Sequence, residues 1–185
     1  MQLVDIIRQV RRDLEEEPDA DDIVDWANRC LDDLTSIVKK EAKQTYTIDS
    51  NNAYPLPPDF HDFAYLIIGG EQYYPVTQDD FRTRGFKVWG GTLSIQEGPT
   101  TGTMEFYYFR KLARLTTTNT AAEPEIDEPF HDLLILYAVG QLQFTEEDYD
   151  DRPDFMQRYY ARKVEYSNYV MKKRRKGRTI EKVVW

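Results

Sequence analysis

Two histidines, each followed by an acid, are the side chains of this sequence best suited to acid–base or metal chemistry. His61 precedes Asp62 and His131 precedes Asp132, and a phenylalanine lies beside each pair. A metal site needs a closer cluster of His and Cys ligands. A lone histidine near the start of a helix is more often structural. We therefore assign neither a metal-binding nor a catalytic role to these residues.

Cys30 is the only cysteine, so no disulfide can form within the chain. It falls on the apolar face of a predicted helix, where a small buried side chain is favoured over a nucleophile, because a reactive thiolate needs a polar and partly exposed setting. A single free thiol also fits assembly in a reducing cytosol.

The glycine and carboxylate patterns give no further chemistry. Gly69-Gly70 and Gly90-Gly91 lack the spacing of a phosphate-binding loop and predict hairpin turns instead. The acidic runs at 15–17, 79–80 and 146–148 match no calcium loop and predict a solvated surface. The sequence therefore predicts a protein that is not an enzyme and has no cofactor and no metal.

The C-terminal end is the feature that most requires a partner. Residues 172–185 hold seven basic residues and one acid, which leaves 17 of the 24 basic and 32 of the 33 acidic residues to the rest of the chain. The basic residues and the apolar end are Lys172, Lys173, Arg174, Arg175, Lys176, Arg178, Lys182, Val183, Val184 and Trp185. Such a segment adds a strand to a neighbouring protein or fills its groove. A solubilising terminus and a nucleic-acid-binding tail remain as alternatives.

No stretch of the sequence predicts a membrane segment. The longest apolar run, at 133–139, is far shorter than the roughly 18 residues that a spanning helix needs. The first residues show no basic segment followed by an apolar one, so we expect no signal peptide.

Apolar spacing predicts four helices. The first covers 3–14, and the second starts at Asp19 as N-cap and ends among Lys39, Lys40 and Lys43. The third begins near Pro129 and is buried on nearly all sides. The fourth covers about 153–173, and its candidate packing residues are Phe155, Tyr159, Val164, Tyr166 and Val170.

Between the second and third helices the apolar period changes from 3.6 to 2 at Thr45, which predicts five to six short strands. The predicted fold class is α+β: a four-helix bundle with an antiparallel β-meander inserted between helices 2 and 3, and an extended C-terminal tail. The expected parts are the first half of the bundle (1–44), the β region (45–112), a mobile loop (113–127), the second half of the bundle (128–173) and a basic docking tail (174–185).

Three segments in this order resemble the head-to-tail adaptor, or connector, proteins of tailed bacteriophages. They are the acid-capped entry to the second helix, PDADDIVDWAN at 18–28; the β core with YPLPPDF at 54–60 and GFKVWGGTLSI at 85–95; and the buried helix at 126–144. The resemblance covers nearly the whole chain, although the basic C-terminus is less typical of the family.

The resemblance implies a virion protein without enzymatic activity that is assembled in the cytoplasm of a bacterial host. Its copies would form a ring, usually dodecameric, below the portal protein, and would join the capsid to a tail-side protein such as a stopper, nozzle or tail tube. Genomic DNA would pass through the channel without specific binding, which suits an acidic wall. The basic tail would dock on the portal.

Exposed aromatic side chains on the β region would form the contacts with neighbouring copies or with the tail, and we expect these to be Tyr73, Tyr74, Trp89 and Tyr107. Two other functions remain open. The chain is a nucleic-acid-binding protein if the basic tail binds DNA, or a carbohydrate-binding module if the aromatic side chains line a concave site.

Overall fold

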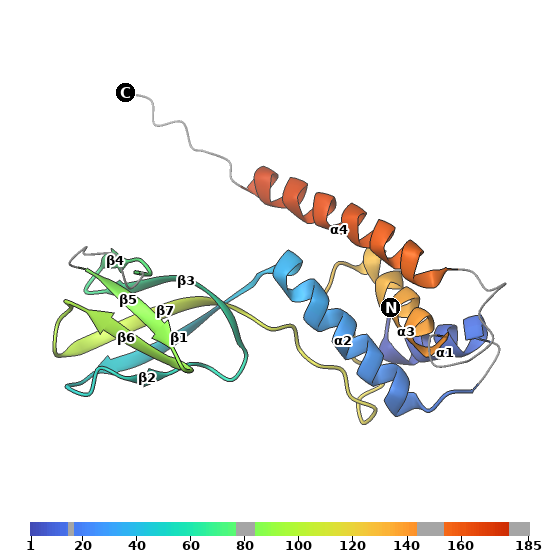
Figure 1. Ribbon diagram of the computed structural model, residues 1–185, viewed down its shortest axis with the longest axis horizontal. Coiled ribbons are helices and arrows are strands. Elements are labelled where there is room, and N and C mark those ends of the chain that lie inside the picture. Colours follow the sequence, from blue (N-terminus) through green and yellow to red (C-terminus); the bar gives the residue numbers. More distant parts are fainter. Residues whose placement is uncertain (15–16, 77–83, 144–153, 178–185) are drawn as a thin grey trace. The chain divides into compact units, whose positions relative to one another are not determined.

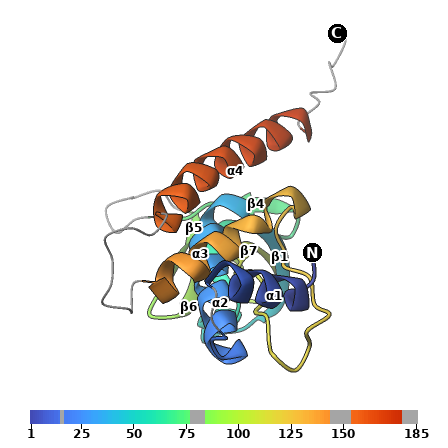
Figure 2. The ribbon, with the colours of Figure 1, turned by 90° about the vertical axis from the view of Figure 1, so that its right-hand side faces the viewer.

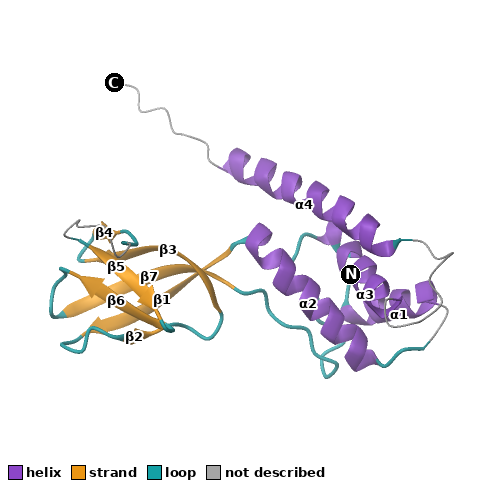
Figure 3. Ribbon diagram, in the orientation of Figure 1, coloured by secondary structure: helices purple, strands orange, loops and turns teal. Residues whose placement is uncertain are grey.

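A computed structural model describes residues 1–14, 17–76, 84–143 and 154–177 (Figure 1). Over these residues the chain is α+β and forms two compact units. The helical unit comprises Met1–Val38 and the described part of Leu112–Trp185, and the β unit comprises Lys39–Lys111. Among these residues, every α-helix belongs to the first unit and every strand to the second (Figure 3).

The helical unit contains four α-helices and one short 3-10 helix among the described residues. They are α1 (Leu3–Leu14), α2 (Ala20–Val38), the 3-10 helix (Glu128–Phe130), α3 (Asp132–Gln143) and α4 (Phe155–Gly177). The Asp19 carboxylate accepts a hydrogen bond from the backbone N–H of Asp21 at 3.1 Å, so Asp19 caps α2 as its sequence position predicts.

Helix α2 ends earlier than its lysines predict. Its last residue is Val38, and Lys39 has a φ of 49°, in the left-handed region that stops a right-handed helix. Strand β1 begins at the next residue, Lys40. The lysines expected at the end of the helix therefore start the β unit.

The predicted four-helix bundle is wrong. Helix α3 lies among α1, α2 and α4 (Figure 2) and packs against each of them. Its side chains are buried on nearly all sides. The other helices therefore surround α3 instead of sharing one interior as in a bundle. Its near-continuous apolar surface explains this arrangement, because a bundle helix needs one polar face toward water.

The segment 113–127 has no regular secondary structure, but it is fixed to the helices. The Asn28 side chain donates a hydrogen bond to the Leu115 carbonyl at 3.0 Å and accepts one from the Leu115 N–H at 2.8 Å. The backbone N–H of Leu3 donates to the Ala122 carbonyl at 2.9 Å. These contacts attach the segment to α2 and to the start of α1, and its mobility stays a prediction.

The β unit is not a meander, and the predicted insertion of one is wrong. Its strands form two antiparallel sheets, ordered β1-β7-β3-β4 and β2-β6-β5. They are β1 (Lys40–Ile48), β2 (Tyr54–Pro55), β3 (Phe60–Ile68), β4 (Glu71–Tyr73), β5 (Gly85–Trp89), β6 (Thr92–Gln96) and β7 (Gly102–Arg110). The first strand pairs with the last, and such a long-range pairing is not encoded in the alternation of single strands.

The core of the β unit is rich in aromatic side chains. Phe86 and Phe106 are fully buried with ring centroids 6.2 Å apart, and Phe106 stacks on Tyr108 at 5.4 Å. The predicted hairpin at Gly90-Gly91 joins β5 to β6, and both glycines have positive φ values that other residues rarely adopt.

Candidate interaction surfaces

The basic residues at the end of α4 are partly engaged within the helical unit. Lys173 forms an ion pair with Asp127, and this hydrogen bond raises the pKa of the lysine. One guanidinium nitrogen of Arg174 donates to the carbonyls of Ile37 and Val38, both at 2.8 Å. Lys172 is exposed and forms no ion pair with a described acid. Of these three predicted docking residues, Lys172 is therefore the one available to a partner.

The helix also extends further than the sequence predicts. Residues 174–177 belong to α4 and are helical, not extended. The side chains of Arg175 and Lys176 lie outside the described residues, as do Arg178, Val183, Val184 and Trp185.

Helix α4 has two apolar faces. Tyr159, Tyr166 and Val170 are buried against the helical unit, whereas Tyr160, Val164 and Met171 are 58%, 62% and 48% exposed. Val164, one of the candidate packing residues of this helix, is therefore not packed against the helical unit.

We call these three exposed residues the α4 stripe. Their spacings of four and seven residues place them along one line of the helix. Reasoning from the sequence missed the stripe because apolar residues occur on both faces of this helix. The spacing of Tyr160, Val164 and Met171 is the signal that could have identified it. An exposed line of large apolar side chains is typical of a protein–protein contact.

The predicted aromatic residues of the β unit divide into buried and exposed ones. Tyr74 and Trp89 are 61% and 83% exposed. The prediction of an exposed Tyr73 is wrong, because its side chain is only 5% exposed within the core of the unit. Successive side chains of an extended segment point to opposite faces, so Tyr73 and Tyr74 differ for this reason.

Tyr107 lies in a half-buried cluster on the β1-β7-β3 sheet. Its ring stacks on Tyr65 with centroids 4.7 Å apart, and its hydroxyl donates to Glu105 at 2.9 Å. Lys43 donates to the other oxygen of Glu105 at 3.0 Å. This bond is the main cause of a lowered Glu105 pKa, while the bond to Glu105 raises the pKa of Tyr107. The cluster is an ordered surface of aromatic rings and paired charges.

Cys30 is buried, as predicted. Its sulfur lies 3.7 Å from the Leu133 carbonyl oxygen and 3.9 Å from the Tyr159 hydroxyl. Burial is the main cause of a strongly raised thiol pKa, which disfavours the reactive thiolate. Tyr159 donates to Asp33, which also accepts a 2.6 Å bond from Lys163.

The two histidines differ in their exposure to solvent. His61 is exposed on β3, whereas His131 is buried and its Nε2 lies 3.1 Å from the Ile126 carbonyl oxygen. Among the described residues no group of three or more His, Cys, Asp and Glu side chains is placed to hold a metal ion. No helix of the described chain is long and apolar enough to cross a membrane.

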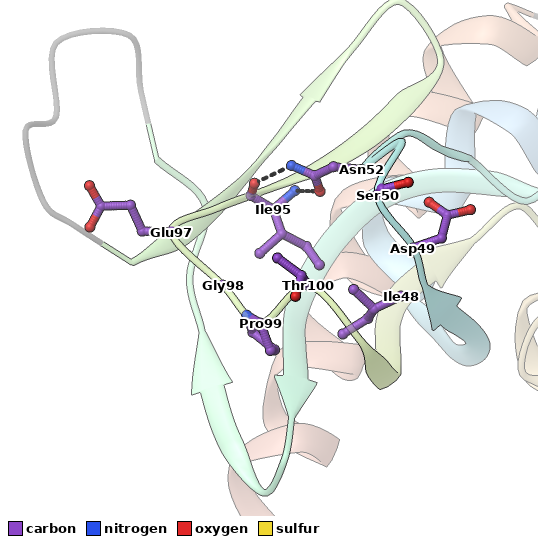
Figure 4. A pocket seen from close by; sticks show the side chains of 9 residues that line it. All are labelled: Ile48, Asp49, Ser50, Asn52, Ile95, Glu97, Gly98, Pro99 and Thr100. Atoms are coloured by element: carbon purple, nitrogen blue, oxygen red, sulfur yellow. Dashed lines mark hydrogen bonds between the residues drawn. The ribbon is translucent and has the colours of Figure 1, made fainter.

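A pocket of about 260 Å³ lies at one end of the β unit (Figure 4). Ile48 and Ile95 contribute its apolar lining, and the Asn52 amide bonds to the backbone of Ile95 at 2.6 and 2.8 Å. Trp89, Tyr74 and Tyr107 are not among its lining residues. The carbohydrate-binding alternative required a concave site lined by exposed aromatic side chains, and this pocket does not provide one.

Each of the two compact units exposes large apolar side chains to solvent, a feature typical of proteins that contact other proteins. The chain belongs to the SU10 adaptor protein family, whose model matches residues 1–179. This family is one of phage head-to-tail adaptors, so the resemblance seen in the sequence is confirmed and the chain is a phage structural protein and a virion component. No curated protein matches the chain.

Proposed function

We propose that copies of this chain form a ring that joins the portal protein to a tail-side protein and encloses the channel through which DNA passes. The observation that carries this proposal is the membership of nearly the whole chain in a family of head-to-tail adaptors. The two exposed apolar surfaces, on α4 and on the β unit, support it, because a ring subunit that joins two partners needs several separate contacts.

The α4 side docks on the portal in this proposal. The α4 stripe offers Val164 and Met171, exposed Lys172 adds a positive charge, and residues 178–185 add further basic and apolar side chains. Lys173 and Arg174 have a structural role instead, since they hold α4 to Asp127 and to the end of α2.

The β unit meets the tail-side protein or the neighbouring copy through Tyr74 and Trp89. Large aromatic side chains are frequent anchors at interfaces because they bury much area with few rotatable bonds. The DNA itself is not bound, because residues 1–171 carry 32 acidic and 17 basic side chains and therefore repel phosphate.

Native mass spectrometry of the protein, alone and mixed with the portal ring of the same virus, tests this function. We expect about one copy to join per portal subunit. A variant that ends at Gly177 removes residues 178–185 and leaves the contacts of Lys173 and Arg174 in place, so we expect it to fold and to lose portal binding. A full-length protein that never joins the portal contradicts the proposal.

The nucleic-acid alternative has its own measurement. It requires DNA binding that falls steeply with salt and depends on 172–178. If the protein does not bind DNA at low salt, the nucleic-acid hypothesis is excluded. If it binds DNA and does not join the portal, the nucleic-acid function replaces the adaptor function.

A further inference from the structure

The β unit has a group of exposed cations where its first and last strands meet. We call Lys39, Lys40 and Lys111 the basic end. Lys40 and Arg110 are directly opposite each other in the β1–β7 register. Lys39, Lys40 and Lys111 are exposed and form no ion pair with a described acid.

The helical unit has a matching group of acids. Asp21, Asp22 and Asp25, which we call the acidic start of α2, are exposed and form no ion pair with a described cation. Acids further along the helix do have partners, as Asp32 pairs with Arg114 at 2.8 Å. The helix dipole explains an acid in the first turn, but its effect ends within that turn and does not account for Asp25.

The two groups of one molecule cannot pair with each other through Lys39 and Lys40. These lysines directly follow Val38, the last residue of α2, whereas Asp25 lies near the start of the same helix. At 1.5 Å per residue the two positions are about 20 Å apart along the helix axis. Two side chains cannot span that distance, so Lys39 and Lys40 can meet an acidic start of α2 only on another molecule.

We propose that the basic end of one copy binds the acidic start of α2 of a second copy. This inference rests on the proposed ring and identifies a contact between its neighbouring subunits. The two surfaces differ, so each copy uses its basic end toward one neighbour and its acidic start toward the other. A contact of this heterologous kind closes into a ring when the rotation between copies is right.

A nucleic acid offers the basic end the same negative charge. The second copy is favoured because this chain itself presents acids, at the start of α2, that have no described cation as partner and that its own Lys39 and Lys40 cannot reach. Opposite charges on two surfaces also steer their encounter and suppress wrong partners.

Two charge-reversed variants test the contact. Lys39→Glu with Lys40→Glu reverses the basic end, and Asp22→Lys with Asp25→Lys reverses the acidic start. We expect each variant alone to associate at least about ten-fold more weakly than the wild type, because like charges then face each other. An equimolar mixture of the two should recover association, because alternating copies bring opposite charges together at every junction. Glu123→Lys and Lys87→Glu, which lie outside both groups, serve as controls and should associate normally.

Disulfide trapping identifies the residues directly. Lys40→Cys in one copy and Asp22→Cys in a second copy of different mass should form a cross-linked pair, while buried Cys30 stays unreacted. Circular dichroism of every variant checks the fold. A mixture that fails to recover, together with no cross-link, overturns the contact.

The outcomes separate this contact from the ring itself. If the wild type joins the portal and both reversed variants do so equally well, the contact is wrong and the ring function stands. If the wild type does not join the portal but the mixed cysteine variants cross-link in solution, the contact stands and the ring function is wrong. If reversal of Lys39 and Lys40 lowers only DNA binding, the basic end binds nucleic acid and the contact is overturned.

Discussion

Asn28 and Leu115 exchange two hydrogen bonds across 87 positions of the sequence. The Asn28 side chain is buried on α2, and its amide satisfies both backbone polar groups of Leu115. This pair fixes the chain where it returns from the β unit to the helical unit, so one side chain holds a segment that has no regular secondary structure.

We expect Asn28→Ala to lower the free energy of unfolding by about 2–4 kcal/mol, because it leaves a buried N–H and a buried carbonyl without partners. Urea denaturation of the variant measures this loss. Ser36→Ala, an exposed change on the same helix, is the control and should stay within about 0.5 kcal/mol of the wild type. An equal stability of Asn28→Ala and the control would contradict this role.

A second prediction concerns Tyr159, whose hydroxyl joins α4 to α2. Tyr159→Phe keeps the buried ring and removes the hydroxyl that donates to Asp33. We expect a loss of about 1.5–3 kcal/mol, the range for a hydrogen bond to a charged group. Tyr160→Phe on the exposed face should change the unfolding free energy by less than about 0.5 kcal/mol, and equal effects of the two changes would count against the assignment.

Alkaline pH should destabilise the protein through the same region. Burial is the main cause of a strongly raised Tyr159 pKa and raises the pKa of Tyr166 to about 12, from an unfolded value of 10.0. The folded state therefore keeps protons that the unfolded state releases, so the stability that these two tyrosines contribute is full below pH 10 and falls as the pH rises above it. Buried Cys30 adds to this fall from about pH 9, its ordinary value.

Denaturation at a series of pH values from 8 to 11 measures this fall. Tyr159→Phe removes one raised group, so its slope above pH 10 should be shallower by about 1.4 kcal/mol per pH unit. Identical slopes in the two proteins would show that Tyr159 ionises as easily in the folded state as in the unfolded one.

Local elements of the fold follow from the sequence, because their signals lie within a few residues. The spacing of Leu3, Ile6, Ile7 and Val10 predicts α1, which the structure confirms with the same bounds, and Gly90-Gly91 predicts the hairpin. The arrangement of the elements does not follow. No short sequence pattern predicts that β1 pairs with β7 or that three helices surround α3, because both depend on contacts between residues far apart in the chain.

The candidate surfaces were only partly predictable for a related reason. A tyrosine has an apolar ring and a polar end, so its type does not decide whether it is buried, as adjacent Tyr73 and Tyr74 show. In the same way, the positive charge of Lys173 and Arg174 predicts a docking surface. In the structure Lys173 pairs with Asp127 and Arg174 donates to the end of α2, so both bind within the helical unit.

Two valines of α4 separate packing from docking. Val170 is buried and Val164 is exposed on the α4 stripe. We expect Val170→Ala to cost about 2 kcal/mol of stability through lost burial and a cavity, and Val164→Ala to cost less than about 0.5 kcal/mol. Urea denaturation measures both. A large loss of stability in Val164→Ala would mean that its side chain is packed within the unit.

Tyr73 and Tyr74 allow the same separation on the β unit. Tyr73→Ala removes a buried ring, so we expect a loss of about 3–5 kcal/mol in the free energy of unfolding, by analogy with other buried aromatic residues. Tyr74→Ala should leave that free energy unchanged within about 0.5 kcal/mol.

If Tyr74 and Trp89 anchor the contact with a neighbouring copy or with the tail-side protein, replacing either by alanine should weaken that binding by about 2 kcal/mol, or roughly thirty-fold. Calorimetry of the folded variants with the tail-side protein, and their assembly on the portal, decide this. Normal binding and assembly by a folded double variant would exclude the two side chains from the interface and leave the contacts of the β unit to the face around Tyr107.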